Sequence, residues 1–264
     1  MQEVSEDQVL SVLRTLGVQA GDGLLVHSAL HYLGRPVDGP GMYLEALCEA
    51  VVAYNHKGVR SGTGTIAVPT FNFAFARGEP YDPETTPSVG MGVFAELMRN
   101  HPLAKRTTHP MQSLAVIGAE AADLARRDTP SAFDAGSAFE RMVELGFKIL
   151  LLGADIEAVS LLHYSEQRFS VPYRYWKDFT GSVHGVNGWE ARTYRMFVRD
   201  MKLDPKLTLK PVQEFLQAKG KFFSTPLNYG QVAVIDMTDF VAAVDHFLAE
   251  DPFSLVLNRP DREP

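Results

Sequence analysis

The sequence predicts an α/β fold: a single three-layer αβα domain over residues 1–264, built on a central, mostly parallel sheet. Two observations predict it. Short apolar runs alternate with amphipathic stretches as far as residue 172, which is typical of parallel strands joined by crossover helices. The composition, 45% hydrophobic and 22% charged residues, is ordinary for a globular protein of 264 residues and excludes intrinsic disorder.

The expected elements follow one another in regular order. Ser5 to Gln8 has the capping-box pattern, so the first helix is expected to run to about Leu16. The apolar run Leu24–His27 follows a Gly-Asp-Gly turn and is typical of a buried strand. The same alternation predicts helices near 42–54, 93–100, 119–127, 139–145, 160–169 and 238–250, and strands at 65–68, 114–117, 148–152 and 232–235. After residue 172 the rhythm breaks, and an irregular insertion is expected.

Charge and cysteine content narrow the function classes. The net charge of −7 argues against a general nucleic-acid-binding protein. The single cysteine, Cys48, allows neither an internal disulfide nor a cysteine metal cluster, and its place in a predicted amphipathic helix indicates a core position. The first residues carry acids where a signal peptide carries basic residues, and no apolar run reaches membrane length. We therefore expect a cytoplasmic protein that binds neither nucleic acid nor membrane.

The charge is distributed unevenly along the chain. Residues 171–225 hold ten Lys and Arg against five acids, a net charge of +5 that leaves −12 for the rest. Such a run is either an ordinary solvated surface or a surface that meets phosphates. The cluster Tyr173-Arg-Tyr-Trp-Lys177 within it is suited to stacking a base or holding a pyrophosphate.

A histidine and a glutamate stand three residues apart after the predicted strand 148–152. In Ser160-Leu-Leu-His163-Tyr-Ser-Glu166 the helical spacing makes His163 and Glu166 neighbours. A carboxylate beside an imidazole fixes its tautomer and stabilises its charged form, as a general base requires. Taken alone, a helical His/Glu pair is more often an ion pair on the protein surface. The HxxE pattern, without a third ligand, is not a metal motif, so no metal is expected.

Two further loops at predicted strand ends carry polar groups. Arg106-Thr-Thr-His109-Pro-Met-Gln-Ser113 could hold a phosphate or form a plain polar loop. His27-Ser28 is followed by a Gly-rich loop that could cradle phosphates at a helix start. The chain has no GxGxxG after the first strand, no P-loop and no G-x-S-x-G elbow, which argues against dinucleotide binding, P-loop chemistry and an α/β-hydrolase.

Several of these segments together resemble one family. In order they are LLVHSAL…LG (24–34), GTIAVPTF (64–71), YDPETTPSVG (81–90), FAELMRN…KRTTHPMQSLAVIG (94–118), GFKILLLGAD (146–155) and SLLHYSE (160–166). The chain resembles the aminoglycoside 3-N-acetyltransferases, acyl-CoA-dependent N-acyltransferases unrelated in fold to the common GNAT acetyltransferases. The resemblance covers about residues 5–180.

The resemblance implies roles for individual residues. His163 matches the proposed general base and Glu166 its carboxylate partner, while Ser160 stands where the resistance enzymes carry Thr. Ala29 replaces the second Ser of the family's HSS motif, and Thr107 replaces a Ser. The coenzyme A contacts implied are His27, Ser28, Gly34, Pro69, Thr70, Arg106, Thr107, His109 and Ser113; the acceptor contacts expected are Asn72, Asp82, Tyr173, Arg174 and Lys177.

The basic segment 171–225 is the expected acceptor-specificity segment. Aminoglycosides are polycations, so its charge favours relatives that acylate an amino sugar linked to a nucleotide diphosphate for surface-polysaccharide synthesis. The expected reaction is acyl transfer from acyl-CoA (acetyl, or a longer group such as 3-hydroxybutyryl) to that amine. The alternatives are an aminoglycoside 3-N-acetyltransferase and a non-catalytic module that binds CoA or nucleotide sugar. A homo-oligomer is expected from fold analogy, and the apolar tail 253–257 is either an interface strand or core.

Overall fold

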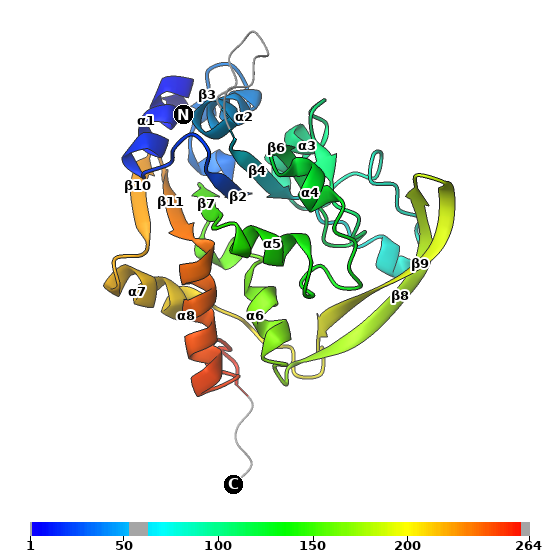
Figure 1. Cartoon of the computed structure of the whole chain (residues 1–264). Helices are drawn as coiled ribbons and strands as arrows, with labels where there is room; N and C mark the ends of the chain where they lie inside the picture. Colours follow the sequence, from blue (N-terminus) through cyan, green and yellow to red (C-terminus); the bar gives the residue numbers. More distant parts are fainter. Residues whose placement is uncertain (1, 53–62, 260–264) are drawn as a thin grey trace.

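A seven-stranded sheet forms the centre of the computed structural model, which describes residues 2–52 and 63–259. The strand order is β10-β11-β7-β2-β4-β6-β5, and helices cover both faces of the sheet (Figure 1). The strands of this sheet are β2 (Gly23–Ser28), β4 (Thr65–Pro69), β5 (Lys105–Arg106), β6 (Leu114–Gly118), β7 (Lys148–Leu152), β10 (Phe223–Leu227) and β11 (Gly230–Asp236). Two short strands, β1 (Glu3–Val4) and β3 (Arg35–Pro36), pair apart from it.

The helices divide between the two faces. One face carries α1 (Glu6–Thr15), α2 (Gly41–Leu47) and α3 (Gly92–Arg99). The other carries α4 (Ala121–Ala125), α5 (Ala138–Glu144), α6 (Leu162–Arg168), α7 (Lys210–Ala218) and α8 (Met237–Glu250). The expected α/β fold with a large central sheet between helical layers is confirmed.

Successive residues of each central strand enter different cores. In β2, Leu24 and Val26 pack with α1 to α3, whereas Leu25 packs with α4 to α8. In β7, Ile149 and Leu151 alternate in the same way with Leu150 and Leu152. Side chains of a strand point alternately to opposite faces, so a sheet covered on both sides needs an unbroken apolar run. This explains why the strands read as continuous hydrophobic stretches.

The N-terminal helix α1 begins with the capping box that the sequence predicts. The Ser5 hydroxyl accepts from the Gln8 backbone N–H, and the Gln8 side chain accepts from the Ser5 backbone N–H. Val9, Leu10 and Leu13 are buried on one side of the helix. The next predicted helix, 42–54, is shorter in α form: α2 ends at Leu47 and a π-helical turn, Cys48–Val52, follows. Residues 53 and 54 lie outside the described residues.

The sheet is mixed rather than mostly parallel. Parallel pairing is confined to β2 with β4 and β2 with β7, while the other four neighbouring pairs are antiparallel. The prediction was wrong here because a strand buried on both faces has the same apolar pattern whichever way its neighbour runs.

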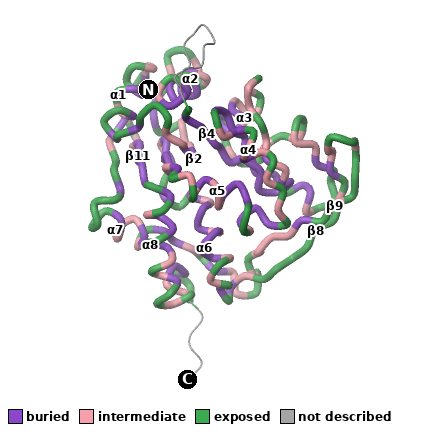
Figure 2. Tube along the Cα trace, viewed as in Figure 1, coloured by how far each residue is buried: buried purple, intermediate pink, exposed green. Residues whose placement is uncertain are grey.

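The expected irregular insertion after residue 172 is a regular hairpin. Strands β8 (Arg174–Gly185) and β9 (Gly188–Arg199) pair along their full twelve residues each. The hairpin is a long curved arm that begins beside α6 (Figure 1), and most of its residues are exposed or half-buried (Figure 2). Asn187-Gly188 at its tip is a hairpin turn signal, and Gly188 has φ +97°. With neither face continuously apolar, the strands lacked the pattern used to find the others.

The C-terminal part contains two elements that the sequence did not predict, α7 and β10. The apolar tail after α8 is partly core: Leu255 is fully buried and Val256 forms a β-bridge with Leu207, whereas Leu257 is exposed. In the described residues, no helix combines the length and apolarity needed to span a membrane.

Gly118, at the end of β6, fixes how closely β4 and β6 approach. It has φ +121°, and a Cβ there would lie 2.2 Å from the Gly64 carbonyl oxygen. We expect Gly118→Ala to lower the free energy of unfolding by about 3–5 kcal/mol, combining backbone strain with overpacking. Gly136→Ala is the matched control, since Gly136 has φ +82° with nothing within 4 Å. It should cost about 1–2 kcal/mol from strain alone. Equal losses in urea unfolding would contradict the steric argument.

Candidate active site

The carboxyl ends of three parallel strands meet at one edge of the sheet. His27 and Ser28 end β2, Pro69 ends β4, and Leu152 ends β7. The chain leaving β7 turns through Gly153 and reaches α6, which carries His163 and Glu166. In open α/β sheets, ligands bind outside the carboxyl ends of the strands. The predicted histidine–glutamate pair is therefore placed where this fold binds ligands.

His163, Glu166 and Arg174 form a connected charged group. Nδ1 of His163 lies 2.6 Å from Oε2 of Glu166, and Nε of Arg174 lies 2.9 Å from the same oxygen. A second nitrogen of Arg174 lies 3.3 Å from Nδ1 of His163. Glu166 is fully buried, the Arg174 side chain is 8% exposed, and that of His163 is 33% exposed. The helical spacing of α6 joins the first two residues, and the first residue of β8 supplies the third.

Glu166 is kept ionised inside the protein. Burial pushes the pKa of its carboxyl upward, but His163 and Arg174 more than offset this, so the net shift is downward. Burial, and secondly the Glu166 charge, raise the pKa of the neighbouring Tyr173 hydroxyl. With an ionised Glu166 accepting from Nδ1–H, Nε2 of His163 is the ring nitrogen left to accept a proton.

Two cavities share His163, Phe71 and Arg199 in their walls. The hairpin cavity, about 250 Å³, lies between α6 and the end of β9; its wall includes Phe73, Phe133, Glu166, Arg174 and Phe197. The strand-end cavity, about 560 Å³, has His27, Pro69, Ser160 and Lys206 in its wall. A side chain at the junction of two cavities can reach a group bound in either one.

The strand-end cavity contains polar atoms that need a partner. Nε2 of His27 and Oγ of Ser160 are buried and form no hydrogen bond with any described residue. Burial also lowers the pKa of His27 to about 4, so its imidazole is neutral near pH 7 and offers both a donor and an acceptor. With Lys206 and Arg199 nearby, this donor set fits the amides and phosphates of coenzyme A.

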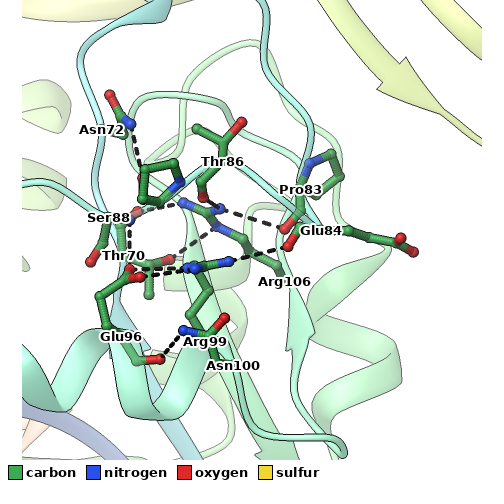
Figure 3. Close-up of polar contacts among 11 residues, drawn as sticks. Thr70, Asn72, Pro83, Glu84, Thr86, Ser88, Glu96, Arg99, Asn100 and Arg106 are labelled. Carbon is green, nitrogen blue, oxygen red and sulfur yellow. Dashed lines mark hydrogen bonds and ion pairs between the residues drawn. The ribbon is translucent and has the colours of Figure 1, made fainter.

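Arg106 is bonded within the protein (Figure 3). Its guanidinium donates to the Thr70 carbonyl at 2.8 Å, to the Ser113 hydroxyl at 3.0 Å and to the Thr86 carbonyl, and it lies over the Tyr81 ring. Thr70 and Ser113 are fully buried around it. This placement gives Arg106, Thr70 and Ser113 the task of fastening the loop 82–90 to the ends of β4 and β6. It does not bring them into either cavity.

The other predicted CoA contacts also have internal partners or lie away from the cavities. Thr107 accepts from the Leu114 N–H, and His109 accepts from the Gln112 N–H with its ring edge against Tyr194. Gly34, with φ +96°, forms a tight turn against Asn228, and Ser28 pairs with Leu152. Of the CoA contacts predicted, His27 and Pro69 line the strand-end cavity.

The predicted acceptor contacts divide in the same way. Arg174 lines the hairpin cavity. Asn72 bonds to Pro87 and Ala74, Asp82 closes its own turn with Glu84 and Thr85, and Tyr173 is fully buried. Lys177 lies over the Phe179 ring on the hairpin.

Sequence reasoning missed several cavity residues. Arg199 and Phe197 line the hairpin cavity from β9, and Lys206 lines the strand-end cavity. The hairpin turn at Asn187-Gly188 was the available signal, since it would have predicted strands that return Arg199 beside Arg174. Among the residues that the structure describes, no group of three His, Cys, Asp or Glu is placed to hold a metal ion.

The model of the aminoglycoside 3-N-acetyltransferase family matches residues 25–249, most of the chain. The chain belongs to this family. The family match reaches well beyond residue 180, where the sequence resemblance ended, and covers the hairpin and α7 as well.

Individual relatives agree with the family match. An aminoglycoside N(3)-acetyltransferase III of a Salmonella species is 32% identical over 190 residues. The aligned part covers 68% of this chain and 66% of the length of that relative. An aminoglycoside N(3)-acetyltransferase VIII of Streptomyces fradiae is 31% identical over 74% of this chain and 70% of its own. The crystal structure of the aminoglycoside acetyltransferase AAC(3)-IVa apoenzyme is 25% identical, with a TM-score of 0.77 over 97% of this chain and 92% of its own.

These comparisons correct the expected acceptor. The relatives are aminoglycoside acetyltransferases, so the expectation of a nucleotide-linked amino sugar is wrong. That expectation rested on the +5 charge of residues 171–225, which acids from other parts of the chain partly neutralise in the folded protein. Four of the ten cations counted there pair with acids outside that stretch: Arg174 with Glu166, Arg192 with Asp128, Arg195 with Asp134 and Lys221 with Asp239.

Arg106→Met tests whether this arginine holds the fold or a ligand. Removing the guanidinium leaves buried acceptors around Thr70 and Thr86 unpaired, so we expect the free energy of unfolding to fall by about 2–4 kcal/mol. The neighbouring exposed Lys105→Met is the control and should stay within about 0.5 kcal/mol. Urea unfolding and calorimetric titration with CoA measure the two properties. Unchanged stability together with lost CoA affinity would make Arg106 a cofactor residue after all.

Proposed function

We propose that this protein transfers the acetyl group of acetyl-CoA to an amino group of an aminoglycoside, as an N-acyltransferase. The observation that carries the proposal is the position of His163, at the junction of two cavities with Nδ1 held by Glu166. Family membership supplies the reaction class, and the names of the relatives supply the acceptor class.

His163 acts as the general base in this proposal. As the acceptor nitrogen attacks the thioester carbonyl, a C–N bond forms, the C–S bond breaks and the nitrogen loses a proton. Nε2 of His163 accepts that proton, and the imidazolium can return it to the departing CoA sulfur. General-base catalysis of this kind contributes about 10²–10⁴-fold to the rate.

Glu166 and Arg174 prepare His163 for this step. The Glu166 carboxylate, 2.6 Å from Nδ1, fixes the tautomer in which Nε2 is free of hydrogen. It also faces the positive charge that His163 gains during the reaction. Arg174 supplies the permanent counterion that allows a carboxylate to remain ionised at a fully buried position.

The strand-end cavity is the proposed CoA site, and the hairpin cavity is the proposed acceptor site. The unpartnered His27 and Ser160 atoms can bond to polar groups of CoA, while Lys206 and Arg199 can meet its phosphates. The open end of the hairpin, where β8 begins and β9 ends, forms one wall of the proposed acceptor site. This supports an acceptor-specificity role for this part of residues 171–225. The use of acetyl-CoA, an intracellular metabolite, favours a cytoplasmic location.

Direct transfer is favoured over an acyl-enzyme on cysteine. Cys48 is buried in the core beside α1 to α3, and burial, together with Glu45, raises the pKa of its thiol to about 11. A thiol of that kind has little thiolate at neutral pH.

The decisive assay follows CoA thiol release from acetyl-CoA with an aminoglycoside panel and with the buffer alone. We expect acceptor-dependent release, and His163→Gln should reduce kcat by about 10²–10⁴-fold while CoA still binds. The control is His246→Gln, an exposed histidine on α8 outside the two cavities. Unchanged turnover in His163→Gln would exclude the base role, and CoA binding without any turnover would favour a non-catalytic binding module.

The charged group around Glu166 can be tested by separating stability from catalysis. Glu166→Gln leaves Arg174 buried without its counterion, so the free energy of unfolding should fall by about 3–5 kcal/mol. The double variant Glu166→Gln with Arg174→Met removes both charges and should recover most of that loss. Because Nδ1 of His163 still lacks a carboxylate, kcat should stay at least about 10²-fold low in the double variant. Recovery of kcat along with stability would show that Glu166 has only a structural task.

A further inference from the structure

Two glutamines line the hairpin cavity, and they differ in what they bond. Gln167 on α6 is fully occupied, because its Oε1 accepts from the Ser131 hydroxyl at 2.8 Å and its Nε2 donates to Asp134 at 2.7 Å. The side chain of Gln112 forms no hydrogen bond with any described residue, although Gln112 is only 6% exposed. A buried amide without a partner lowers stability, so this one calls for an explanation.

The backbone around Gln112 is firmly held. The Gln112 N–H donates to Nδ1 of His109 at 3.1 Å, and the carbonyl of Ser113 accepts from the Thr70 N–H at 2.9 Å. Met111 and Ser113, on either side of Gln112, are fully buried. The carboxamide therefore projects from a fixed point, as a group that orients a ligand requires.

The hairpin cavity is the space in which the Gln112 carboxamide can meet a ligand. Gln112 also borders a space of about 10 Å³ beside Thr107 and Phe139, which has room for at most a water molecule. The hairpin cavity, about 250 Å³, brings Gln112 and His163 into one wall. The amide atoms of Gln112 keep some exposed surface, whereas Oε1 of Glu166, which is also unpartnered, is enclosed. The carboxamide can thus donate to and accept from a molecule in this cavity.

The size and walls of the hairpin cavity limit what it can hold. Its volume of about 250 Å³ is below the range of about 300–1,000 Å³ for pockets that enclose a drug-sized ligand. It therefore takes one ring of an aminoglycoside rather than the whole molecule. Phe71 and Phe133 offer that ring flat surface, and the ring of Phe133 lies 5.7 Å from that of His163. A ring on flat surface can still turn in its own plane, so a directional contact is needed to fix it.

We infer that the Gln112 carboxamide supplies this contact, by hydrogen-bonding a polar substituent of the ring that carries the reacting amine, and so decides which amine reaches His163. This assignment rests on the proposed function and deepens it, because it names a residue that sets regioselectivity. Both hydroxyl and amino substituents of such a ring can bond to a carboxamide. Because transfer depends steeply on the placement of the reacting atoms, a contact that fixes the ring also raises the rate.

The test replaces Gln112 by Met, a side chain of similar length that forms no such bonds. With kanamycin A at saturating acetyl-CoA, kcat/KM for the acceptor should fall about 5- to 100-fold. The KM for acetyl-CoA should stay unchanged, because Gln112 does not line the strand-end cavity. Kanamycin A carries several amines, so the products are separated and assigned by NMR. The wild-type protein should give one main mono-acetylated isomer and Gln112→Met a mixture.

Three outcomes of this test would overturn the inference. They are an unchanged kcat/KM in Gln112→Met, a lower kcat/KM with the same distribution of isomers, and a wild-type protein that already gives a mixture.

Stability separates a ligand-binding role of Gln112 from a structural one. Gln112→Met should keep or raise the midpoint of urea unfolding, because an apolar group replaces an unpartnered amide. Gln167→Met is the matched control from the same cavity wall. It removes two internal hydrogen bonds, so its midpoint should fall while its main product stays the same isomer. An equal fall in Gln112→Met would indicate a structural role and contradict the inference.

A binding measurement distinguishes this inference from the proposed function. If the wild-type protein acetylates no aminoglycoside, the proposed function fails, and kanamycin A is then titrated calorimetrically into the wild-type protein and Gln112→Met. Binding at least about 5-fold weaker in the variant would still support a contact between Gln112 and the ligand. Equal binding to both proteins, or no binding to the wild-type protein, would exclude it.

Discussion

The buried carboxylate of Glu166 is the constraint on which the site and its surroundings depend. An ionised group with no exposure is tolerated only with charged partners, and the chain supplies them from two elements. Helix α6 provides His163 one turn away, and the start of β8 provides Arg174. The position of the hairpin is thereby fixed relative to α6. Tyr173, just before the hairpin, packs on Phe253, so the C-terminal segment is tied to the same point.

The layered fold was predictable because its signals are local. The capping box of Ser5 and Gln8 and the apolar run of β7 each report a structure that forms within a few residues. Strand direction was not predictable, because β11 and β7 are apolar for the same reason although they run antiparallel. The hairpin was missed because one side of β8 and β9 faces solvent along most of its length, leaving Asn187-Gly188 as the main signal.

In the candidate site, too, the residues placed by local spacing were predictable, and those placed by distant contacts were not. His163 and Glu166 were predictable, since three-residue spacing on a helix guarantees neighbours. Arg106 was assigned to CoA because an arginine beside hydroxyls at a strand end has the composition of a phosphate site. Its actual acceptors include the backbone carbonyls of Thr70 and Thr86, which a sequence does not display. The basic segment misled for a related reason, because the acids that neutralise it lie far away in the chain.

The charge arrangement fits what acyl transfer to an amine demands. A carboxylate left unpaired beside the acceptor would hold its ammonium form, and the proton would then be harder to remove. In this chain Glu166 contacts the imidazole through Oε2 and is paired with Arg174 at the same oxygen. The phenylalanines of the hairpin cavity, among them Phe71, Phe133 and Phe197, supply flat apolar surface against which the apolar face of a sugar ring can pack, so that the one buried carboxylate remains committed to the imidazole.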